Sequence, residues 1–262
     1  MTTFKIVTVY PDFFSSFLSS SFIARTIDRK LIDIKVIDLK DYSFSKSRRV
    51  DDSPISGGAG LILKIDSLVN CLKKTCSEKT YKVLFSPRGK RYNQRDAKRL
   101  SEKEEIIFFC GHFEGIDSRF SSYVDEEISL GDYILTGGEL PAMILIDSIT
   151  RLISGAINDE SIKDESFNSS LLEYDQYSYP LNYDGKKVPD ILLSGNHQVI
   201  EKYHLKNSLK NTIEKRKDLL DNLFYNREIA KYYQEIVEEK EGDLEKKIDA
   251  AIKKRNSSKI KK

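Results

Sequence analysis

The first 155 residues alternate short apolar stretches with longer stretches in which apolar side chains recur at helical spacing. Stretches rich in β-branched and aromatic residues predict strands, and apolar side chains three or four positions apart predict helices. The predicted strands are residues 4–10, 32–38, 81–85, 106–110 and 133–136. The predicted helices are residues 13–27, 61–76, 94–100 and 140–153. Because strands that alternate with helices pair in parallel, residues 1–155 are predicted to form one α/β domain with a mainly parallel sheet.

The pattern changes after this domain. Residues 156–174 are rich in Asn, Ser, Asp and Glu and show little periodicity, which predicts a linker or mobile loop. Helical spacing then returns in four segments, namely residues 197–211, 218–224, 228–239 and 244–255. The sequence therefore predicts a small helical domain over residues 175–262.

Charge and cysteine usage narrow the class of protein. The formal net charge of +2 does not by itself mark a nucleic-acid binder, although residues 253–262 carry no acid and either contact phosphates or form a solvated end. The 3 cysteines form no Cys-x-x-Cys pair, so the sequence supports neither a disulfide framework nor a zinc cluster. No apolar run approaches the roughly 20 residues that cross a bilayer. We therefore expect a cytoplasmic protein with no membrane contact.

Three loops that contain glycine each follow a predicted strand, at residues 86–89, 111–117 and 136–141. The carboxyl ends of parallel strands meet at one edge of a sheet, and ligands of open α/β proteins bind there. Glycines in such loops let main-chain groups approach a flat ring closely, although glycines also serve simply in tight turns. The convergence of the three loops predicts a site for a nucleoside-containing cofactor.

A fourth glycine cluster, over residues 56–61, fits neither of two nucleotide motifs. No Gly-Lys-Ser/Thr follows it, and Leu63 occupies the third glycine position of a dinucleotide fingerprint. The preceding Asp51 and Asp52 fit either a helix cap or turn, or a metal site. These patterns leave the role of the cluster open.

Several motifs together resemble the bacterial tRNA (guanine-N1) methyltransferases, the TrmD family. The resemblance runs in chain order from the first predicted strand to about Leu220, and its longest block covers residues 125–140. The motifs are Val-Asp-Asp at 50–52, Ser-Pro-Arg-Gly at 86–89, Cys-Gly-His-Phe-Glu-Gly-Ile-Asp at 110–117, Glu-Ser-Phe at 165–167 and Leu-Leu-Ser-Gly-Asn-His at 192–197.

The resemblance implies a SPOUT-type fold, in which a parallel α/β sheet carries a deep trefoil knot and is followed by a small helical C-terminal domain. The rule that chains do not thread loops speaks against a knot, so this expectation comes from the family alone. The resemblance also implies a homodimer with active sites at the subunit interface. The implied reaction uses S-adenosylmethionine and methylates N1 of guanosine 37 in tRNA, with help from magnesium whose ligands we do not assign.

Methylation of guanine N1 needs a base, because the neutral ring carries a proton there, and a cation that steadies charge on O6. The family places its base, commonly an aspartate, before a Ser-Phe pair, which here gives Glu165 with Asp164 as the alternative. Arg151 matches the family arginine that holds the target base, and a guanidinium keeps its charge at any working pH. The residues 156–174 would thus carry the base to the site.

The resemblance also implies which residues bind the methyl donor. These are Pro87, Gly111, Phe113, Glu114, Gly115, Leu130, Gly131, Asp132, Tyr133, Ile134, Leu135, Gly138 and Pro141. The family commonly has tyrosine at the position of Phe113, and arginines at those of His112, Tyr179 and His204. Losing these cations weakens the expected contacts with RNA phosphates more than it affects the methyl chemistry.

Two other functions remain possible from the sequence. A knotted methyltransferase of the same class could instead methylate a ribose 2′ oxygen, which needs no acid in the linker. A protein that only binds RNA could retain the fold without catalysis, although the unbroken cofactor loops favour an enzyme.

Overall fold

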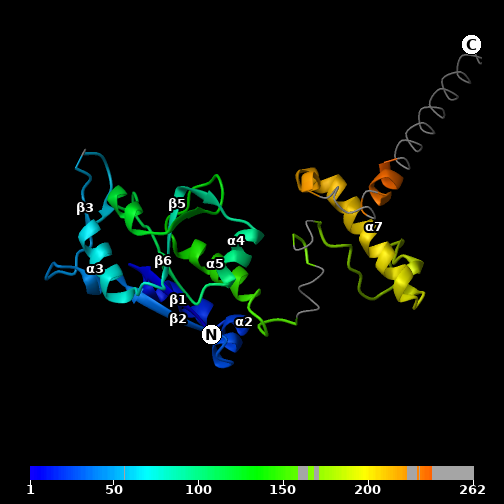
Figure 1. The fold of residues 1–262 in the computed structure, drawn as a ribbon, viewed down its shortest axis with the longest axis horizontal. Coiled ribbons are helices and arrows are strands. Elements are labelled where there is room, and N and C mark those ends of the chain that lie inside the picture. The colour runs from blue at the N-terminus through cyan, green and yellow to red at the C-terminus, as the bar shows by residue number, and fades with distance from the viewer. Residues whose placement is uncertain (56, 159–164, 168–170, 223–228, 230, 238–262) are drawn as a thin grey trace, which may run out of the picture. The chain divides into compact units, whose positions relative to one another are not determined.

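The computed structural model describes residues 1–55, 57–158, 165–167, 171–222, 229 and 231–237 (Figure 1). The chain divides into two compact units, Met1–Asp159 and Glu160–Lys262. The first unit contains the central sheet, and the second contains the long helix α7 (His197–Lys215).

The core of the first unit is a 5-stranded sheet in the order β2-β1-β6-β5-β7. Each neighbouring pair of strands runs in parallel, as the sequence predicted. The strands are β1 (Thr2–Thr8), β2 (Ile32–Asp38), β5 (Tyr81–Arg91), β6 (Glu105–Phe109) and β7 (Glu126–Ser129). Because all five run in the same direction, the loops that follow them emerge at one edge.

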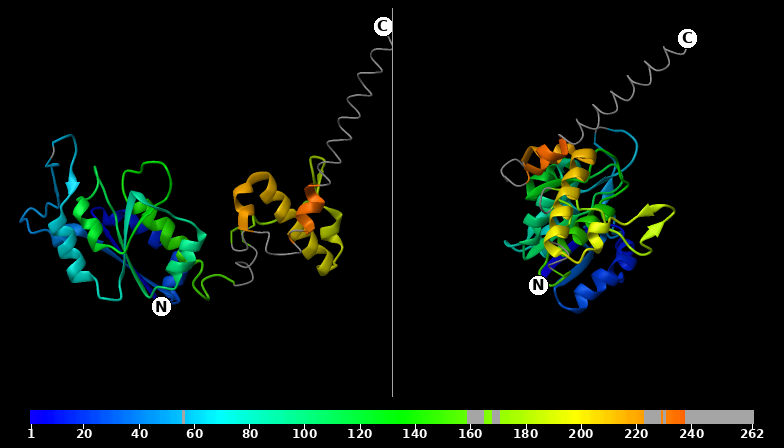
Figure 2. Two further views of the ribbon diagram at one scale, coloured as in Figure 1. Left: turned by 45° about the horizontal axis from the view of Figure 1, so that its top comes forward. Right: turned by 90° about the vertical axis from the view of Figure 1, so that its right-hand side faces the viewer.

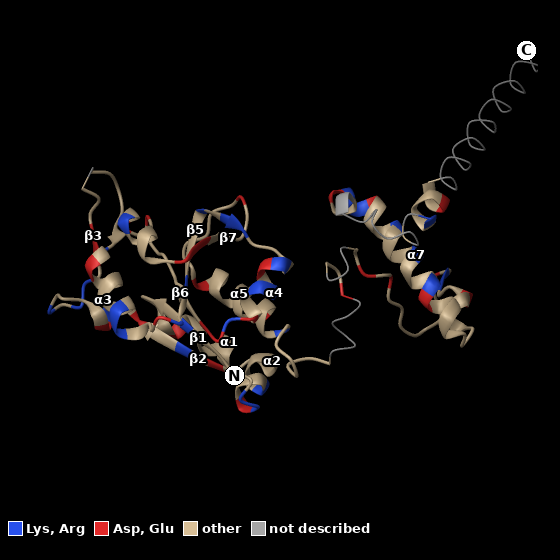
Figure 3. Ribbon diagram, viewed as in Figure 1, with Lys and Arg blue, Asp and Glu red and all other residues tan. Residues whose placement is uncertain are grey.

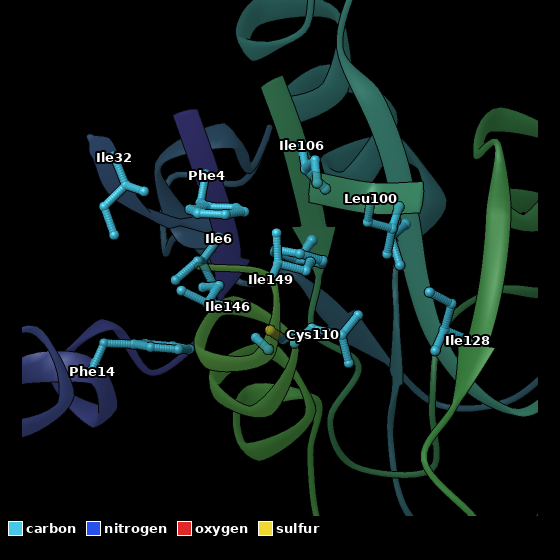
Figure 4. Packing of buried hydrophobic residues seen from close by; sticks show 14 of the residues in the cluster. Phe4, Ile6, Phe14, Ile32, Leu100, Ile106, Cys110, Ile128, Ile146 and Ile149 are labelled. Atoms are coloured by element: carbon cyan, nitrogen blue, oxygen red, sulfur yellow. The ribbon is translucent and has the colours of Figure 1, made fainter. Parts of the chain in front are cut away.

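Alternate residues of the central strands face opposite sides of the sheet and fill two separate hydrophobic cores. On one side, Phe4 of β1 packs with Ile146 and Ile149 of the helix α5 (Glu139–Thr150) (Figure 4). Phe108 of β6 belongs to the same core. The same core takes residues from α2 (Ser21–Asp28) and α4 (Gln94–Ser101). The sheet is thus covered on this side by helices (Figure 2).

The other side of the sheet is covered by α3 (Ile65–Thr75). Val7 of β1 and Phe109 of β6 pack there with Leu68 and Cys71 of α3, and all four side chains are buried. Burial on both faces explains why β1 and β6 are apolar runs rather than alternating ones. The sheet is held between two layers and forms a rigid base for the loops at its edge.

The predicted helix over residues 13–27 is broken in the structure. It consists of the 3-10 helix η1 (Pro11–Phe14), the short α1 (Ser15–Leu18) and α2. The hydroxyl of Ser20 donates a hydrogen bond to the carbonyl of Phe17 at 2.7 Å, and Ser20 itself is extended. Serine hydroxyls that bond nearby carbonyls compete with helical hydrogen bonds, which accounts for the break.

The predicted strand over residues 133–136 is wrong, because these residues form a loop and the strand is β7. Glu126 and Glu127 give β7 a polar sequence, unlike the apolar pattern expected of a buried strand. The predicted helix over residues 61–76 begins only at Ile65, because β4 (Ile62–Leu63) pairs with β3 (Asp51–Asp52). Residues 86–89 lie within β5 as a bulge, since Phe85 and Lys90 both pair with Ile128.

The second unit has its own small core. In it α7 packs with the 3-10 helix η5 (Lys217–Asn222) and with a helical segment over residues 231–237. The core residues are Leu171, Leu209, Ile213, Leu220, Tyr232 and Ile236. A hairpin of β8 (Asn182–Tyr183) and β9 (Lys186–Lys187) precedes the 3-10 helix η4 (Asp190–Leu193).

Of the predicted helices in this part of the chain, α7 includes residues 197–211 and continues to Lys215. The predicted helix over 218–224 is the 3-10 helix η5 where it is described, and residues 231–237 are helical within the predicted 228–239 segment. The predicted helix over 244–255 lies outside the described residues.

Candidate functional site

A cavity of about 350 Å³ lies at the carboxyl end of the sheet, between the bulge within β5 and the loops that follow β6 and β7. Its volume is within the usual range for a small-molecule site. The residues that line it are Phe85, Ser86, Pro87, Gly111, His112, Phe113, Glu114, Gly115, Ile128, Ser129, Leu130, Gly131, Tyr133, Ile134, Leu135, Thr136, Gly137, Gly138 and Pro141. The three glycine-containing loops of the sequence therefore meet in one place.

Close main-chain contacts fix these loops against the sheet. The amide of Gly138 donates a hydrogen bond to the carbonyl of Gly111 at 2.8 Å, which joins the start of α5 to the end of β6. A Cβ atom on Gly138 would lie only 2.6 Å from Cα of Cys110. Position 138 therefore requires glycine because two main-chain segments touch there.

A second contact ties the loop after β6 to the glycine cluster at residues 56–61. The amide of Glu114 donates to the carbonyl of Leu61 at 3.0 Å, and the amide of Leu63 donates to the carbonyl of Gly115 at 3.0 Å. Gly60 has a φ of +89°, and the side chain of Glu114 occupies the space beside its Cα. The cluster thus supports the cavity wall, a role that its sequence left open.

Apolar side chains line the cavity and remain open to solvent. Ile134 is 80% exposed, and Tyr133, Leu135 and Phe113 of the lining are also exposed. Residues 133–136, which the sequence predicted to be a strand, are apolar because they line the cavity. Several large apolar side chains gathered around a concave surface are typical of a ligand site.

The polar interior behind the cavity contains a carboxylate and a thiol. Glu139, the first residue of α5, is buried and accepts a hydrogen bond from the hydroxyl of Thr8 at 2.7 Å. Burial raises the pKa of the Cys110 thiol well above its usual value, and the nearby carboxylate of Glu139 raises it further. Cys110 is 2% exposed and packs within the core that covers one side of the sheet.

Comparison with known proteins agrees with these motifs. The model of the family tRNA (Guanine-1)-methyltransferase TrmD matches residues 2–222. The tRNA (guanine-N(1)-)-methyltransferase of Carboxydothermus hydrogenoformans is 43% identical over 217 residues, which are 82% of this chain and 86% of that protein. The protein of the same name from Dictyoglomus turgidum is 41% identical over 240 residues, or 91% and 98% of the two chains.

This chain belongs to the TrmD family. A further relative, from Aster yellows witches'-broom phytoplasma, is 44% identical over 236 residues and also bears the name tRNA (guanine-N(1)-)-methyltransferase. That match covers 90% of this chain and 98% of the relative. The resemblance drawn from the motifs is confirmed.

The cavity contains all the residues predicted from the TrmD family to bind the methyl donor except Asp132. Asp132 lies outside the lining and forms an ion pair with Arg91 at the basic end of β5 (Figure 3). Lining residues that the resemblance did not assign to donor binding are Phe85, Ser86, His112, Ile128, Ser129, Thr136 and Gly137. All of them except Phe85 lie within the family motifs or the block at residues 125–140, and Phe85 directly precedes the Ser-Pro-Arg-Gly motif.

The residues assigned to catalysis in the TrmD family belong to different units. Arg151 caps the carboxyl end of α5 in the first unit, where its amide donates to the carbonyl of Asp147 at 3.1 Å. Burial raises the pKa of Asp147, and the positive charge of Arg151 opposes that shift. Neither Arg151 nor Glu165 is part of the cavity lining.

Glu165 begins a short described segment of the second unit. The hydroxyl of Ser166 accepts a hydrogen bond from the amide of Glu173 at 2.9 Å, and the amide of Phe167 donates to the carbonyl of Leu171 at 2.9 Å. These bonds tie the residues after Glu165 to the core of that unit. The alternative base Asp164 lies outside the described residues.

Proposed function

We propose that this chain transfers a methyl group from S-adenosylmethionine to N1 of guanosine 37 in tRNA, beside the anticodon. The observation that carries the proposal is the cavity formed by the bulge within β5 and the loops after β6 and β7. Membership of the TrmD family and the names of relatives support the choice of tRNA guanine as the acceptor.

The residues of the cavity fit a nucleoside-containing methyl donor. Ile134 and Leu135 provide apolar surface for a flat base, and Phe113 provides an aromatic ring. Gly138 allows the start of α5 to approach the end of β6, so that the main chain forms part of the wall. When bound, the donor supplies a methyl group on a positively charged sulfur.

The residues of the chain then act on the guanine. We assign the carboxylate of Glu165 to remove the proton from N1, which frees the lone pair that must attack the methyl carbon. The guanidinium of Arg151 would steady the negative charge that develops on O6. Asp164 remains the alternative base, and its replacement is the control for the assignment of Glu165.

A homodimer with shared active sites follows from the same proposal. Leu140 and Ile144 of α5 are 45% and 47% exposed and lie one helical turn apart. Arg151 lies on the same face of α5, two turns beyond Ile144, by helical spacing. An apolar helix face that also carries Arg151 suits an interface at which one subunit completes the site of the other.

Several finer parts of the proposal come from family membership. They are the trefoil knot in the loops of residues 1–155, the role of 156–174 as a linker that carries the base, and the role of 175–262 as a helical domain that binds tRNA. The exposed hairpin lysines, Lys186 and Lys187, would replace some of the cations missing at Tyr179 and His204.

The cellular compartment and the metal requirement are also proposals. The three cysteines Cys71, Cys76 and Cys110 are free thiols, which suits a reducing cytoplasm. None of the helices that the structure describes could span a membrane. The described part of the chain contains no cluster of three or more His, Cys, Asp or Glu side chains that could hold a metal ion. Help from magnesium, which family membership suggests, therefore stays part of the proposal with no ligands assigned.

Nucleoside analysis tests the proposed function. A tRNA transcript with a guanosine at position 37 is incubated with the protein and S-adenosylmethionine, and its nucleosides are separated by mass. We expect 1-methylguanosine. A 2′-O-methylated product would instead indicate ribose methylation, and failure to bind S-adenosylmethionine in calorimetry would indicate a protein that only binds RNA.

A further inference from the structure

The carboxylate of Glu139 is buried directly behind the cavity and has no role in the reaction described above. Glu139 is only 3% exposed to solvent. One oxygen, Oε1, accepts the hydrogen bond from Thr8 at 2.7 Å. The other, Oε2, lies 3.8 Å from Nδ1 of His112, which is part of the cavity lining. Burial of a carboxylate costs folding free energy unless the charge is paired, so the contacts of Glu139 must offset that cost.

The imidazole of His112 is held in place by aromatic contacts. Its ring packs edge-on against Tyr10 at 4.6 Å and against Phe113 at 5.0 Å between centroids. Nδ1 is buried and, among the residues that the structure describes, accepts or donates no hydrogen bond. Oε2 of Glu139 faces this nitrogen, and a shift of about 0.8 Å would bring Oε2 and Nδ1 into hydrogen-bond range.

The surrounding backbone leaves space for this pair. A Cβ atom on Gly137 would collide with the carboxylate of Glu139 and would lie 2.6 Å from Nδ1 of His112. His112 and Gly137 also pair through their main chains in an isolated antiparallel bridge. The two side chains therefore meet where the loop after β6 touches the loop that leads into α5.

Thr8 extends the connection to the end of β1. Its hydroxyl donates to Glu139 and also accepts a hydrogen bond from the amide of Tyr10 at 2.9 Å. Tyr10 in turn packs on His112. Glu139 thus lies at the centre of a ring of contacts between β1, the loop after β6 and the start of α5.

We propose that Glu139 is a positioning residue for the methyl donor. Its carboxylate orients the imidazole of His112 and, through the bridge between His112 and Gly137, sets the spacing of the two loops that enclose the donor. The inference rests on the proposed function only for the identity of the ligand. Glu139 stays behind the wall, so its effect on the donor passes through His112.

The chain contains a matched control at the opposite edge of the sheet. Glu105, the first residue of β6, also takes a hydrogen bond from a threonine hydroxyl, that of Thr80, and forms an ion pair with Lys5 at 2.8 Å. It therefore resembles Glu139 in chemistry but lies far from the carboxyl-end cavity along the strand. Substitution of Glu105 should therefore change only the stability of the protein, whereas substitution of Glu139 should change the affinity for the methyl donor.

The test compares Glu139→Gln with Glu105→Gln in the full chain. Calorimetry with S-adenosylmethionine measures the Kd, and thermal denaturation without ligand measures the Tm. We expect Glu139→Gln to weaken donor binding by about tenfold, because a neutral amide no longer attracts and orients the imidazole of His112. Its Tm should stay the same or rise, because a buried charge has been removed. Glu105→Gln should lower the Tm and leave the Kd unchanged.

A second set of variants separates orientation from packing. His112→Phe keeps the ring contacts with Tyr10 and Phe113 but removes Nδ1, and the double variant with Glu139→Gln should bind no more weakly than His112→Phe alone. His112→Arg offers Glu139 a permanently charged hydrogen-bond partner. This variant should bind S-adenosylmethionine more tightly than His112→Phe if Glu139 positions the side chain at residue 112. Wild-type affinity in Glu139→Gln, or additive losses in the double variant, would overturn the inference. Failure of the wild-type protein to bind the donor would overturn the proposed cofactor as well.

Discussion

The two units of the chain contribute to the proposed reaction in different ways. In the first unit, the cavity is fixed by main-chain contacts, such as that between Gly138 and Gly111, on a sheet that is buried on both faces. In the second unit, Glu165 precedes a short segment that hydrogen-bonds to residues near its core. In the proposed reaction, donor binding and proton removal therefore depend on different units, so variants of one unit should spare the function of the other.

Replacement of the proposed base should give the largest effect. Glu165→Gln keeps the size of the side chain but cannot take a proton, so we expect single-turnover methyl transfer to fall by about 10² to 10⁴-fold. The Kd for S-adenosylmethionine should not change, because the cavity belongs to the first unit. Asp164→Asn is the matched control. Collapse of transfer in that variant, with turnover retained in Glu165→Gln, would move the role to Asp164.

Loss of the guanidinium at position 151 should come next. Arg151→Gln removes the charge that we propose steadies O6, and we expect transfer to slow by about 10² to 10³-fold with unchanged donor affinity. Rapid-quench measurements at saturating donor and tRNA would show the change in the chemical step. A change confined to the KM for tRNA would mean that Arg151 only helps to bind the RNA.

Gly138→Val should act on the first unit alone. The new side chain would collide with the main chain at Cys110, and the resulting displacement of α5 should weaken donor binding on the order of 100-fold. Calorimetry measures the loss directly. Gly185→Ala, in the hairpin of the second unit, is the control: its Cβ meets no atom within 4 Å, and the backbone strain expected at its φ of +76° falls in the other unit, so donor affinity should not change. Normal donor affinity in Gly138→Val would show that the cavity does not depend on this contact.

The smallest expected effect concerns stability and pH. Burial alone would raise the pKa of Glu105, but hydrogen bonds from Lys5 and Thr80 outweigh it and lower the pKa below its ordinary value. A lowered pKa in the folded state stabilises the fold above the ordinary value, and this stabilisation is lost as the pH falls through the folded value. Glu105→Gln should therefore cost about 1 kcal/mol at pH 7. Denaturation curves at pH 7 and in acid should show the two proteins converging in acid.

Much of the first unit could be predicted because its signals are local. The central strands are apolar on both faces, and glycine loops follow them, so both the sheet and the cavity were visible in the sequence. The strand β7 was missed because Glu126 binds Arg99 and Glu127 gives the strand a polar pattern. The sequence predicted a strand at residues 133–136 because loops that line a cavity and buried strands are both rich in apolar side chains.

Other features depend on contacts between distant residues. Glu139 looks like an ordinary acid in the first turn of a helix, and only the approach of Thr8, far earlier in the chain, shows that it is buried and bonded. The function of Gly60 depends in the same way on the side chain of Glu114. Such features follow from tertiary packing, which a pattern of neighbouring residues does not record.

The most direct test of the division between the two units is complementation between inactive subunits. Gly138→Val and Glu165→Gln chains are produced together with different affinity tags, and heterodimers are purified through both tags. If the cavity of one subunit works with Glu165 of its partner, one of the two sites is intact and the heterodimer should regain about half of the wild-type methyl transfer. If both parts come from the same chain, neither site is intact. A heterodimer as inactive as its parents would contradict the shared site.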